Sequence, residues 1–413
     1  MYRNIDKNMN TAKVITFGCR LNAYESEVIN NILKEAQLEN VVVFNTCCVT
    51  NEAEKQAVQA IRKYKRENPI TEIIVTGCAV QINPRKYSTM PEVARVVNNK
   101  EKLLVESYVK ESKSEIETPF LCGFENKTRA LVPIQTGCDH FCTFCIITYA
   151  RGPSKSMPLE RIIKQIKLFV DRGYREVVLT GVNITSYGKD LSEKLNLGQA
   201  VKELLRANPN LTRLRLSSLD VAEIDNDLFE LIANEKRFMP HLHLSLQSGD
   251  NEILHKMKRR HTREQVQNLC QAAYKARPDV VFGADIITGF PTETDEQFTN
   301  TCALVEEMKM PYLHVFPYSE RHGTVAAQMP QLDKKIRKDR AKTLRKIGKN
   351  NLDTFSKSFI GCKVELLLEK NNIGRMKNFL KVYLPDNNLN AGKLIKAKVV
   401  EYKDGNLIGV GIE

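Results

Sequence analysis

The stretch Gln135-Thr136-Gly137-Cys138-Asp139-His140-Phe141-Cys142-Thr143-Phe144-Cys145 lies at the end of an apolar, strand-like run, Leu131–Thr136. Its three cysteines have the spacing C-x-x-x-C-x-x-C. Three thiolates this close together suit a cubane iron–sulfur cluster, because they bind three irons and leave the fourth without a protein ligand. A zinc site is the alternative, but zinc sites usually take four ligands from paired C-x-x-C motifs, and no matching second pair lies nearby.

An open iron is the position at which the amino and carboxylate groups of S-adenosylmethionine (SAM) chelate. The motif therefore predicts a SAM-cleaving iron–sulfur enzyme in which Cys138, Cys142 and Cys145 are metal ligands and catalytic residues.

Beyond this motif, apolar strand-like runs alternate with helical patterns. The further strand-like runs are 176–180, 212–217, 241–247, 280–288 and 312–318. The helical patterns that separate them are 159–172, 197–207, 224–234, 262–276 and 296–309. Six strand–helix units in one stretch predict a partial (β/α)6 barrel, in which chemistry gathers at the carboxyl ends of the strands.

On the N-terminal side, three apolar runs share one plan, since each ends in a small or turn-forming pair and then a cysteine. The runs are Lys13–Cys19, Val41–Cys47 and Glu72–Cys78, with helical patterns between them. Strands separated by helices pair in parallel, and the carboxyl ends of parallel strands meet at one edge. Cys19, Cys47 and Cys78 are therefore predicted to bind a second cluster with one open iron. The alternative is that cysteine merely suits a buried strand end.

The C-terminal segment changes its pattern. Residues 331–359 form a basic helical pattern, which we expect to pack one face on the barrel and to show its charge to solvent. Strand-like alternation follows at 363–369, 377–384 and 393–412, with a hairpin turn at Asp404-Gly405. These features predict a small antiparallel β-barrel, so the fold class is α/β with an N-terminal parallel-sheet domain, a central barrel and a terminal β domain.

The composition bears on location and partners. The 413 residues carry a net charge of +13, 42% hydrophobic residues and 11 cysteines. The basic excess favours a polyanionic partner such as nucleic acid. No apolar run is long enough to span a membrane, and the N-terminus has no secretory signal. We therefore expect a cytoplasmic protein whose cysteines stay reduced and serve in ligation or catalysis.

The cysteine-ended strands, the C-x-x-x-C-x-x-C loop and the terminal β domain together resemble the radical SAM methylthiotransferases, over nearly the whole chain. Within that family the sequence is most similar to the branch that modifies threonylcarbamoyladenosine (t6A) in tRNA. The other stretches that carry the resemblance are Thr46–Ala53, Ile147–Pro153, Leu179–Ile184, Leu246–Gly249, Gly289–Thr294 and Pro317–Ser319. Cys48 and Thr292 depart from the usual family pattern, but no cluster ligand is missing.

The resemblance implies three domains: a methylthiotransferase N-terminal domain at 9–120 with the auxiliary cluster, a radical SAM domain at 124–352 and a TRAM RNA-binding domain at 353–413. It implies insertion of a methylthio group at C2 of t6A at position 37, next to the anticodon, giving ms2t6A. The reaction would use two SAM molecules and two 4Fe-4S clusters. The implied partners are tRNA with a t6A-modified anticodon loop and a flavodoxin- or ferredoxin-type electron donor, with the enzyme a monomer.

Further SAM contacts are expected at the mouth of the barrel, where the strands end. The candidate cofactor-binding residues are Phe144, Gly181, Ser218, Gln247, Arg259, Gly289 and Glu293. Phe144 stands between two cluster ligands and would meet adenine, and Arg259 would pair with the methionine carboxylate. For each of these residues the alternative is an ordinary structural role at the barrel edge.

RNA contacts are expected from the basic helix and from the terminal β domain. The candidate phosphate ligands there are Lys363, Arg375, Lys377, Lys381, Lys393, Lys396 and Lys398, with Phe379 and Tyr383 for stacking. A solvated charged face is the alternative.

Two kinds of alternative function stay open. A relative with the same chemistry would act on isopentenyladenosine in tRNA or on an aspartate of a ribosomal protein, although the basic terminal domain counts against a protein target. In a different class, an RNA-binding module would use its cysteines for structural zinc or for redox sensing. Iron and labile sulfide content separates that class from the enzymes.

Overall fold

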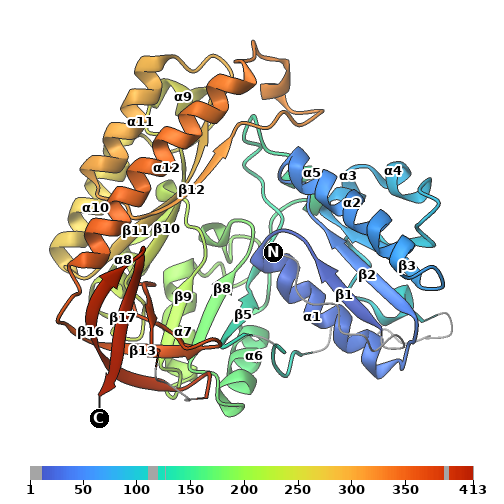
Figure 1. Ribbon diagram of the computed structural model, residues 1–413, viewed down its shortest axis with the longest axis horizontal. Helices are drawn as coiled ribbons and strands as arrows, with labels where there is room; N and C mark the ends of the chain where they lie inside the picture. The colour runs from blue at the N-terminus through green and yellow to red at the C-terminus, as the bar shows by residue number, and fades with distance from the viewer. Residues whose placement is uncertain (1–11, 110–119, 126, 386–389, 413) are drawn as a thin grey trace. The chain divides into compact units, whose positions relative to one another are not determined.

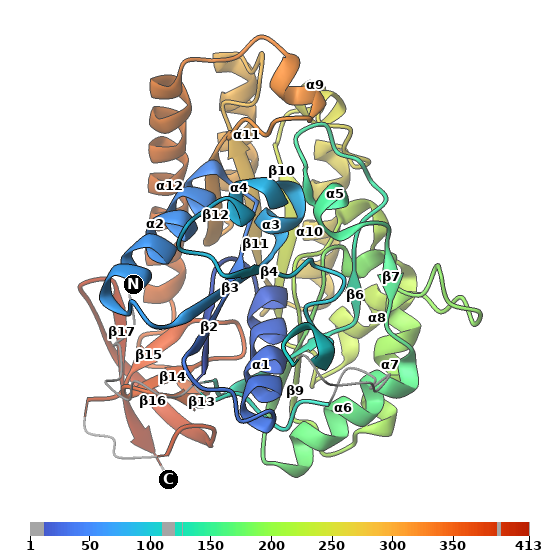
Figure 2. The same cartoon turned by 90° about the vertical axis from the view of Figure 1, so that its right-hand side faces the viewer.

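The computed structural model describes residues 12–109, 120–125, 127–385 and 390–412. The chain divides into two compact units, whose elements are drawn from one side in Figure 1 and after a turn of 90° in Figure 2. The first unit contains the described part of 1–121 together with 136–140 and 145–153. The second contains 141–144 and the described parts of 122–135 and 154–413. The three-domain boundaries expected from the sequence stay predictions.

The first unit is built around a parallel sheet in the order β1-β2-β3-β4. Its elements are β1 (Lys13–Thr16), α1 (Arg20–Glu35), β2 (Val41–Thr46), α2 (Asn51–Glu67), β3 (Glu72–Gly77), α3 (Cys78–Ile82), α4 (Pro84–Ser88), β4 (Arg95–Val96), the 3₁₀ turn η1 (Val105–Ser107) and α5 (Ile147–Arg151). Val42 and Phe44 of β2 pack in one apolar cluster with Ile61 of α2, while α1 covers the other face of the sheet (Figure 1). The predicted parallel α/β domain is confirmed.

The second unit contains six parallel strands in two sheets, β5-β8-β9 and β10-β11-β12. Its strands are β5 (Arg129–Pro133), β8 (Glu176–Thr180), β9 (Arg213–Leu216), β10 (His241–Gln247), β11 (Val281–Thr288) and β12 (Tyr312–Pro317), with the short β7 (Lys155–Ser156) after β5. The short strand β6 (Gln135–Thr136) spans the point at which the chain passes from the second unit to the first. Isolated bridges from Leu214 to Phe238 and from Leu219 to Leu244 connect the two sheets. The predicted partial (β/α)6 barrel is confirmed.

Helices alternate with these strands, and several begin at side chains that cap them. The helices are α6 (Leu159–Asp171), α7 (Leu197–Ala207), α8 (Asn226–Asn234), α9 (Asn251–Lys256), α10 (Arg263–Ala276), α11 (Asp295–Glu307) and α12 (Lys334–Lys357), with 3₁₀ turns η2 (Ile184–Ser186), η3 (Val221–Glu223) and η4 (Val325–Gln328). Asn196, Thr262 and Thr294 each form a capping box with a glutamine three residues on. These boxes satisfy backbone N–H groups that would otherwise lack a partner, so the local sequence sets where α7, α10 and α11 start.

The C-terminal strands form a closed barrel in the order β13-β14-β15-β17-β16. They are β13 (Lys363–Glu369), β14 (Ile373–Arg375), β15 (Lys381–Tyr383), β16 (Leu394–Lys403) and β17 (Asn406–Ile412). Asp404 and Gly405 have φ of 50° and 78°, as the predicted two-residue hairpin requires. The expectation of a fully antiparallel barrel was wrong in one detail, since β15 pairs with β17 in parallel. The single strand predicted at 377–384 was also wrong, because a turn through Phe379 (φ 76°) precedes β15.

The basic helix α12 packs along β12 and α11 in the second unit (Figure 1). Leu344 is fully buried there, which confirms the expected docking. The expectation that its charge faces solvent was wrong for two residues: Arg337 and Arg340 are buried, and Arg340 lies 2.7 Å from the Glu293 carboxylate. Among the described residues, no helix has the length and apolar character that crossing a membrane requires.

Buried charges join the partial barrel to the C-terminal barrel within the second unit. Glu176 of β8 is fully buried between Arg213 and Arg215 of β9, with Nε of Arg215 2.9 Å and Nη1 of Arg213 3.7 Å from its carboxylate oxygens. The same two arginines donate to backbone carbonyls of Arg375 and Lys377. The C-terminal barrel is therefore held to the inner strands of the partial barrel by hydrogen bonds from paired, buried charges.

Phe379 completes this junction. Its ring centroid lies 4.9, 4.8 and 4.4 Å from the guanidinium carbons of Arg129, Arg215 and Arg375, and its ring stacks on His241 at 5.0 Å. Arg375 is buried and paired with Glu369 at 2.9 Å. Arg375 was therefore wrong as an RNA contact, because it is buried and ion-paired. Phe379 is partly exposed and held by cation–π contacts, and its role as an RNA contact stays a prediction.

Glu176→Gln is expected to destabilise the protein by about 3 kcal/mol, because it leaves the buried guanidinium of Arg215 without a carboxylate, while Arg213 keeps Glu365 at 2.8 Å. Burial alone would raise the pKa of Glu176, but Arg215 lowers it below 4.5. The contribution of this carboxylate is therefore present above pH 4.5 and is lost as the pH falls further. Thermal unfolding of the variant and the native protein, measured from pH 7 downward, tests this.

The matched control is Glu203→Gln, which removes an exposed ion pair with Arg206 at the surface of α7. It should change stability by less than about 0.5 kcal/mol. Equal effects of the two variants would contradict the role assigned to Glu176.

Candidate functional site

The N-terminal cysteines stand directly after the strands of the first unit. Cys19 precedes α1 just beyond β1, Cys47 follows β2, and Cys78 follows β3 and begins α3. Because β1, β2 and β3 pair in parallel, the three residues meet at one edge of the sheet. Cys47 and Cys78 are buried and Cys19 is exposed. The structure thus brings together the three residues that the sequence pattern grouped; their role as metal ligands stays a prediction.

Two turns at this edge accept only glycine. Gly18 has φ of +100°, and a Cβ there would lie 2.8 Å from Sγ of Cys47. Gly77 has φ of +102°, and a Cβ there would lie 2.4 Å from the carbonyl oxygen of Thr46. Each glycine immediately precedes a cysteine, so the close approach of the strand ends depends on the missing side chain.

A buried polar network lies beside these cysteines. Nη1 of Arg151 is 2.8 Å and Nζ of Lys102 is 2.5 Å from the carboxylate oxygens of Glu25. Arg151 also donates to the side chain of Asn22 at 2.6 Å. The amide of Asn22 in turn donates to the carbonyls of Phe17 and Thr46, which lie next to the cysteine turns. None of these residues was predicted from the sequence as part of the site.

The surroundings affect the two buried cysteines differently: they favour the thiolate of Cys78 and disfavour that of Cys47. A hydrogen bond from Cys48, with the charges of Arg151 and Lys102, lowers the pKa of Cys78 to about 5, although burial opposes the shift. Burial raises the pKa of Cys47 to about 11. Burial alone would raise the pKa of Glu25, but Lys102 and Arg151 lower it to about 2, so this carboxylate stays charged beside them. Three soft sulfur donors beside buried cations fit an iron–sulfur group.

The loop with the second cysteine triplet is anchored by its backbone. In the first unit, the N–H of Cys138 donates to the carbonyl of Gly152 at 3.1 Å. Gly137 has φ of +71°, and a Cβ there would lie 1.8 Å from the carbonyl oxygen of Pro153. Cys138, Cys142 and Cys145 are each partly exposed.

Residues 141–144 of this loop belong to the second unit and are anchored there. The N–H and Oγ1 of Thr143 donate to the carbonyls of Met257 and Lys256 at 3.2 and 2.9 Å. Phe144 packs beside an apolar cluster that contains Met257 and Phe290. The Phe144 ring, which we expect to contact the adenine of SAM, is thus partly held by apolar packing. Its contact with SAM stays a prediction.

The other candidate cofactor-binding residues lie where the sequence places them, at the carboxyl ends of strands. Gly181 follows β8, Ser218 lies just beyond β9, Gln247 ends β10 and Gly289 follows β11. Gln247 has φ of +72°, a rare conformation for a residue with a side chain. Their contact with SAM stays a prediction.

The two charged candidates already have partners. Nη2 of Arg259 lies 3.1 Å from Asp220, and Nη1 lies 3.6 Å from Sγ of Cys142. Buried Glu293 accepts hydrogen bonds from the N–H of Gly289 at 2.8 Å and from Arg340 at 2.7 Å. The Glu293 carboxylate thus binds the backbone of the loop at Gly289. The Arg259 guanidinium lies next to Cys142, a predicted cluster ligand.

Gly18→Ala is expected to remove the iron of one cluster, from about eight irons per chain to about four, because the new Cβ would press on Sγ of Cys47. The matched control is Gly173→Ala, which has the same sign of φ (+88°) but no atom within 4 Å of its Cβ position. Iron and labile sulfide in anaerobically purified protein are the measurements. Full iron content in Gly18→Ala would contradict the assignment of this edge as a cluster site.

Comparison with known proteins identifies the family. Residues 132–305 match the model of the radical SAM superfamily, and residues 11–98 match "Uncharacterized protein family UPF0004". The chain is 52% identical over 411 residues to threonylcarbamoyladenosine tRNA methylthiotransferase MtaB of Rickettsia prowazekii, with 97% of each chain covered. It is 34% identical to the protein of that name from Bacillus subtilis, again with 97% of each covered. It is 31% identical to the tRNA-2-methylthio-N(6)-dimethylallyladenosine synthase of Finegoldia magna, with 99% of this chain and 96% of that one covered.

A solved structure shares the fold. The radical S-adenosylmethionine methyltransferase TsrM from Kitasatospora setae, solved with cobalamin and a [4Fe-4S] cluster bound, superposes with a TM-score of 0.54 at 13% identity over 77% of each chain. That similarity concerns the fold alone. Two family models match the chain, and relatives are similar to it along almost its entire length. The chain therefore belongs to the radical SAM methylthiotransferase family.

Proposed function

We propose that this protein attaches a methylthio group to C2 of t6A at position 37 of tRNA, giving ms2t6A. The observation that carries the proposal is the sheet edge at which Cys19, Cys47 and Cys78 meet beside buried Arg151, in a chain with a second cysteine triplet in its radical SAM segment. One triplet alone would serve radical formation but would hold no sulfur for transfer. The name of the 52% identical relative supports t6A as the substrate.

Enzymes of this family use SAM and two 4Fe-4S clusters. In this chain Cys138, Cys142 and Cys145 would hold the cluster at which SAM is cleaved, and the N-terminal triplet would hold the cluster that carries sulfur. When bound, these groups supply the one-electron chemistry that breaks an aromatic C–H bond, which acid–base side chains cannot do.

The protein's own residues fix and charge the surroundings of these sites. Arg151 and Lys102 place positive charge beside Cys78, which favours its thiolate. The backbone N–H and the hydroxyl of Thr143 hold the radical SAM loop on Met257 and Lys256. Strand-end residues such as Gln247 offer polar groups at the mouth of the barrel, where SAM would be oriented.

The C-terminal barrel would contact the tRNA backbone. Tyr383 exposes 44% of its surface and can stack on an unpaired base. The exposed lysines of this barrel, which would bind phosphates, are Lys363, Lys377, Lys381, Lys393, Lys396 and Lys398. We further propose that the enzyme is a cytoplasmic monomer and receives electrons from a flavodoxin- or ferredoxin-type donor, because radical SAM chemistry consumes low-potential electrons.

Deleting the gene is expected to abolish ms2t6A in cellular tRNA while t6A remains, because C2 modification follows formation of t6A. Mass spectrometry of digested tRNA nucleosides measures both. Persistence of ms2t6A together with loss of methylthiolated isopentenyladenosine would move the protein to the neighbouring branch of the family.

Cys47→Ala is expected to retain SAM cleavage to 5′-deoxyadenosine and to reduce methylthio transfer at least a hundredfold, because the two functions would reside on different clusters. Chromatographic assay of 5′-deoxyadenosine and of ms2t6A on t6A-containing tRNA measures each separately. Cys122→Ala, at an exposed cysteine outside both triplets, is the control and should retain both activities. Loss of SAM cleavage in Cys47→Ala would contradict the division of labour.

A further inference from the structure

The inner face of β12 presents side chains that the chemistry described so far does not use. On the outer face, Leu313 contacts α12, since its Cδ1 lies 2.8 Å from the Cβ position of Gly348. Side chains alternate along a strand, so Tyr312, His314 and Phe316 point to the opposite face, inside the partial barrel. The His314 side chain is 60% exposed and Phe316 is 40% exposed. A polar ring and an apolar ring are thus accessible on one strand face.

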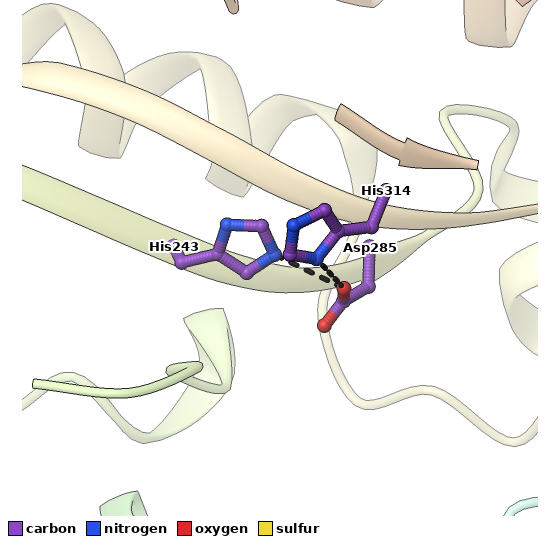
Figure 3. A group of neighbouring side chains, drawn as sticks. All are labelled: His243, Asp285 and His314. Atoms are coloured by element: carbon purple, nitrogen blue, oxygen red, sulfur yellow. Dashed lines mark hydrogen bonds and ion pairs between the residues drawn. The ribbon is translucent and has the colours of Figure 1, made fainter. Parts of the chain in front are cut away.

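Two neighbouring strands hold His314 in place. Asp285 of β11 is its direct partner in the strand register. Nδ1 of His314 and Nε2 of His243 each lie 3.0 Å from the same carboxylate oxygen of Asp285 (Figure 3). The hydroxyl of Ser218 donates to the other oxygen at 3.3 Å. The carboxylate therefore accepts three hydrogen bonds and fixes both imidazole rings.

This arrangement determines which atom His314 offers to a ligand. A carboxylate oxygen only accepts, so Nδ1 of His314 carries the proton that faces Asp285. A neutral imidazole has one N–H, so Nε2 of His314 is then an acceptor. Alternate residues of a strand are about 7 Å apart. Nε2 of His314 and the phenyl ring of Phe316 at that spacing match a substituted nucleobase. The base would stack on the ring, and its substituent would donate a hydrogen bond to Nε2.

The same three residues also have the chemistry of a metal site, since their ligand atoms all lie within 4.8 Å of one another. The surroundings of His243 argue against that use. Its Nδ1 lies 2.6 Å from the Cβ position of Gly283, so it packs against the backbone of β11. A histidine that binds metal through Nε2 carries its proton on Nδ1, where it needs a hydrogen-bond acceptor. The packing of His243 against Gly283 suits an unprotonated Nδ1. The proton of His243 is then on Nε2, where it faces Asp285 and prevents that nitrogen from binding a metal ion.

We propose that His314 and Phe316 bind the t6A nucleoside of the tRNA substrate. The adenine stacks on Phe316, and the threonine hydroxyl of t6A, which unmodified adenosine lacks, donates to Nε2 of His314. Asp285 and His243 are positioning residues behind this contact. The inference rests on the proposed function, since it identifies residues of the barrel that recognise the same substrate.

The test uses the full-length protein with its clusters, under anaerobic conditions, and two anticodon stem-loop RNAs that differ only in t6A or adenosine at position 37. His314→Ala should weaken binding of the t6A stem-loop about fivefold, the loss of one hydrogen bond, and should leave binding of the unmodified stem-loop nearly unchanged. Phe316→Ala should weaken both about tenfold, because stacking does not depend on the modification. His255→Ala, at an exposed histidine on α9, is the matched control and should change neither Kd.

Three outcomes would overturn the inference: His314→Ala weakens both stem-loops equally, or it weakens neither, or the native protein binds the two stem-loops with equal affinity. Zinc or manganese in the native protein at one equivalent, lost in His314→Ala, would likewise overturn it in favour of a metal site. The proposed function is tested separately, by methylthiolation of the t6A stem-loop by the native protein. Activity there without a selective effect of His314→Ala would contradict the inference alone.

Discussion

The Glu25 carboxylate accepts hydrogen bonds from Arg151 and Lys102, which lie 126 and 77 residues away along the chain. A buried charge without a partner is costly, so these three segments stabilise the first unit only when they meet. Arg151 in turn binds Asn22, whose amide donates to the carbonyl of Phe17, next to the turn before Cys19, and to that of Thr46, directly before Cys47. One ion-paired network therefore sets both the positions of the thiols and the charge around them.

Buried charges also have to be paired in the second unit, at the junction of its two barrels. Glu176 lies between Arg213 and Arg215, which donate hydrogen bonds to the backbone of the C-terminal barrel. Phe379 of that barrel packs in turn among guanidinium groups. The four arginines described at this junction are each ion-paired, so the C-terminal barrel is fixed to the strands that carry the candidate SAM and nucleoside contacts. RNA bound by that barrel would then meet the partial barrel in a defined orientation.

Much of the fold follows from local pattern. The period of two in the strands, the intervening helices and the glycine turns predict the parallel sheet, the partial barrel and the Asp404-Gly405 hairpin, and the structure contains all three. The errors lie where a local pattern is overridden by distant contacts. Phe379 interrupts the strand expected at 377–384 because its ring packs among the guanidinium groups of the junction. Arg340 of the basic helix is buried because Glu293 meets it from another segment.

Both cysteine triplets were determined by the sequence itself, because the spacing of thiols along a chain and their place after parallel strands are local properties. The radical SAM loop and the family follow from them. Only the tertiary structure decided which charges are buried and what they contact: that Glu25 joins Arg151 and Lys102, and that Asp285 holds His243 and His314 on one oxygen. Such contacts join residues far apart in sequence, and no local pattern records which segments will pack together when the chain folds.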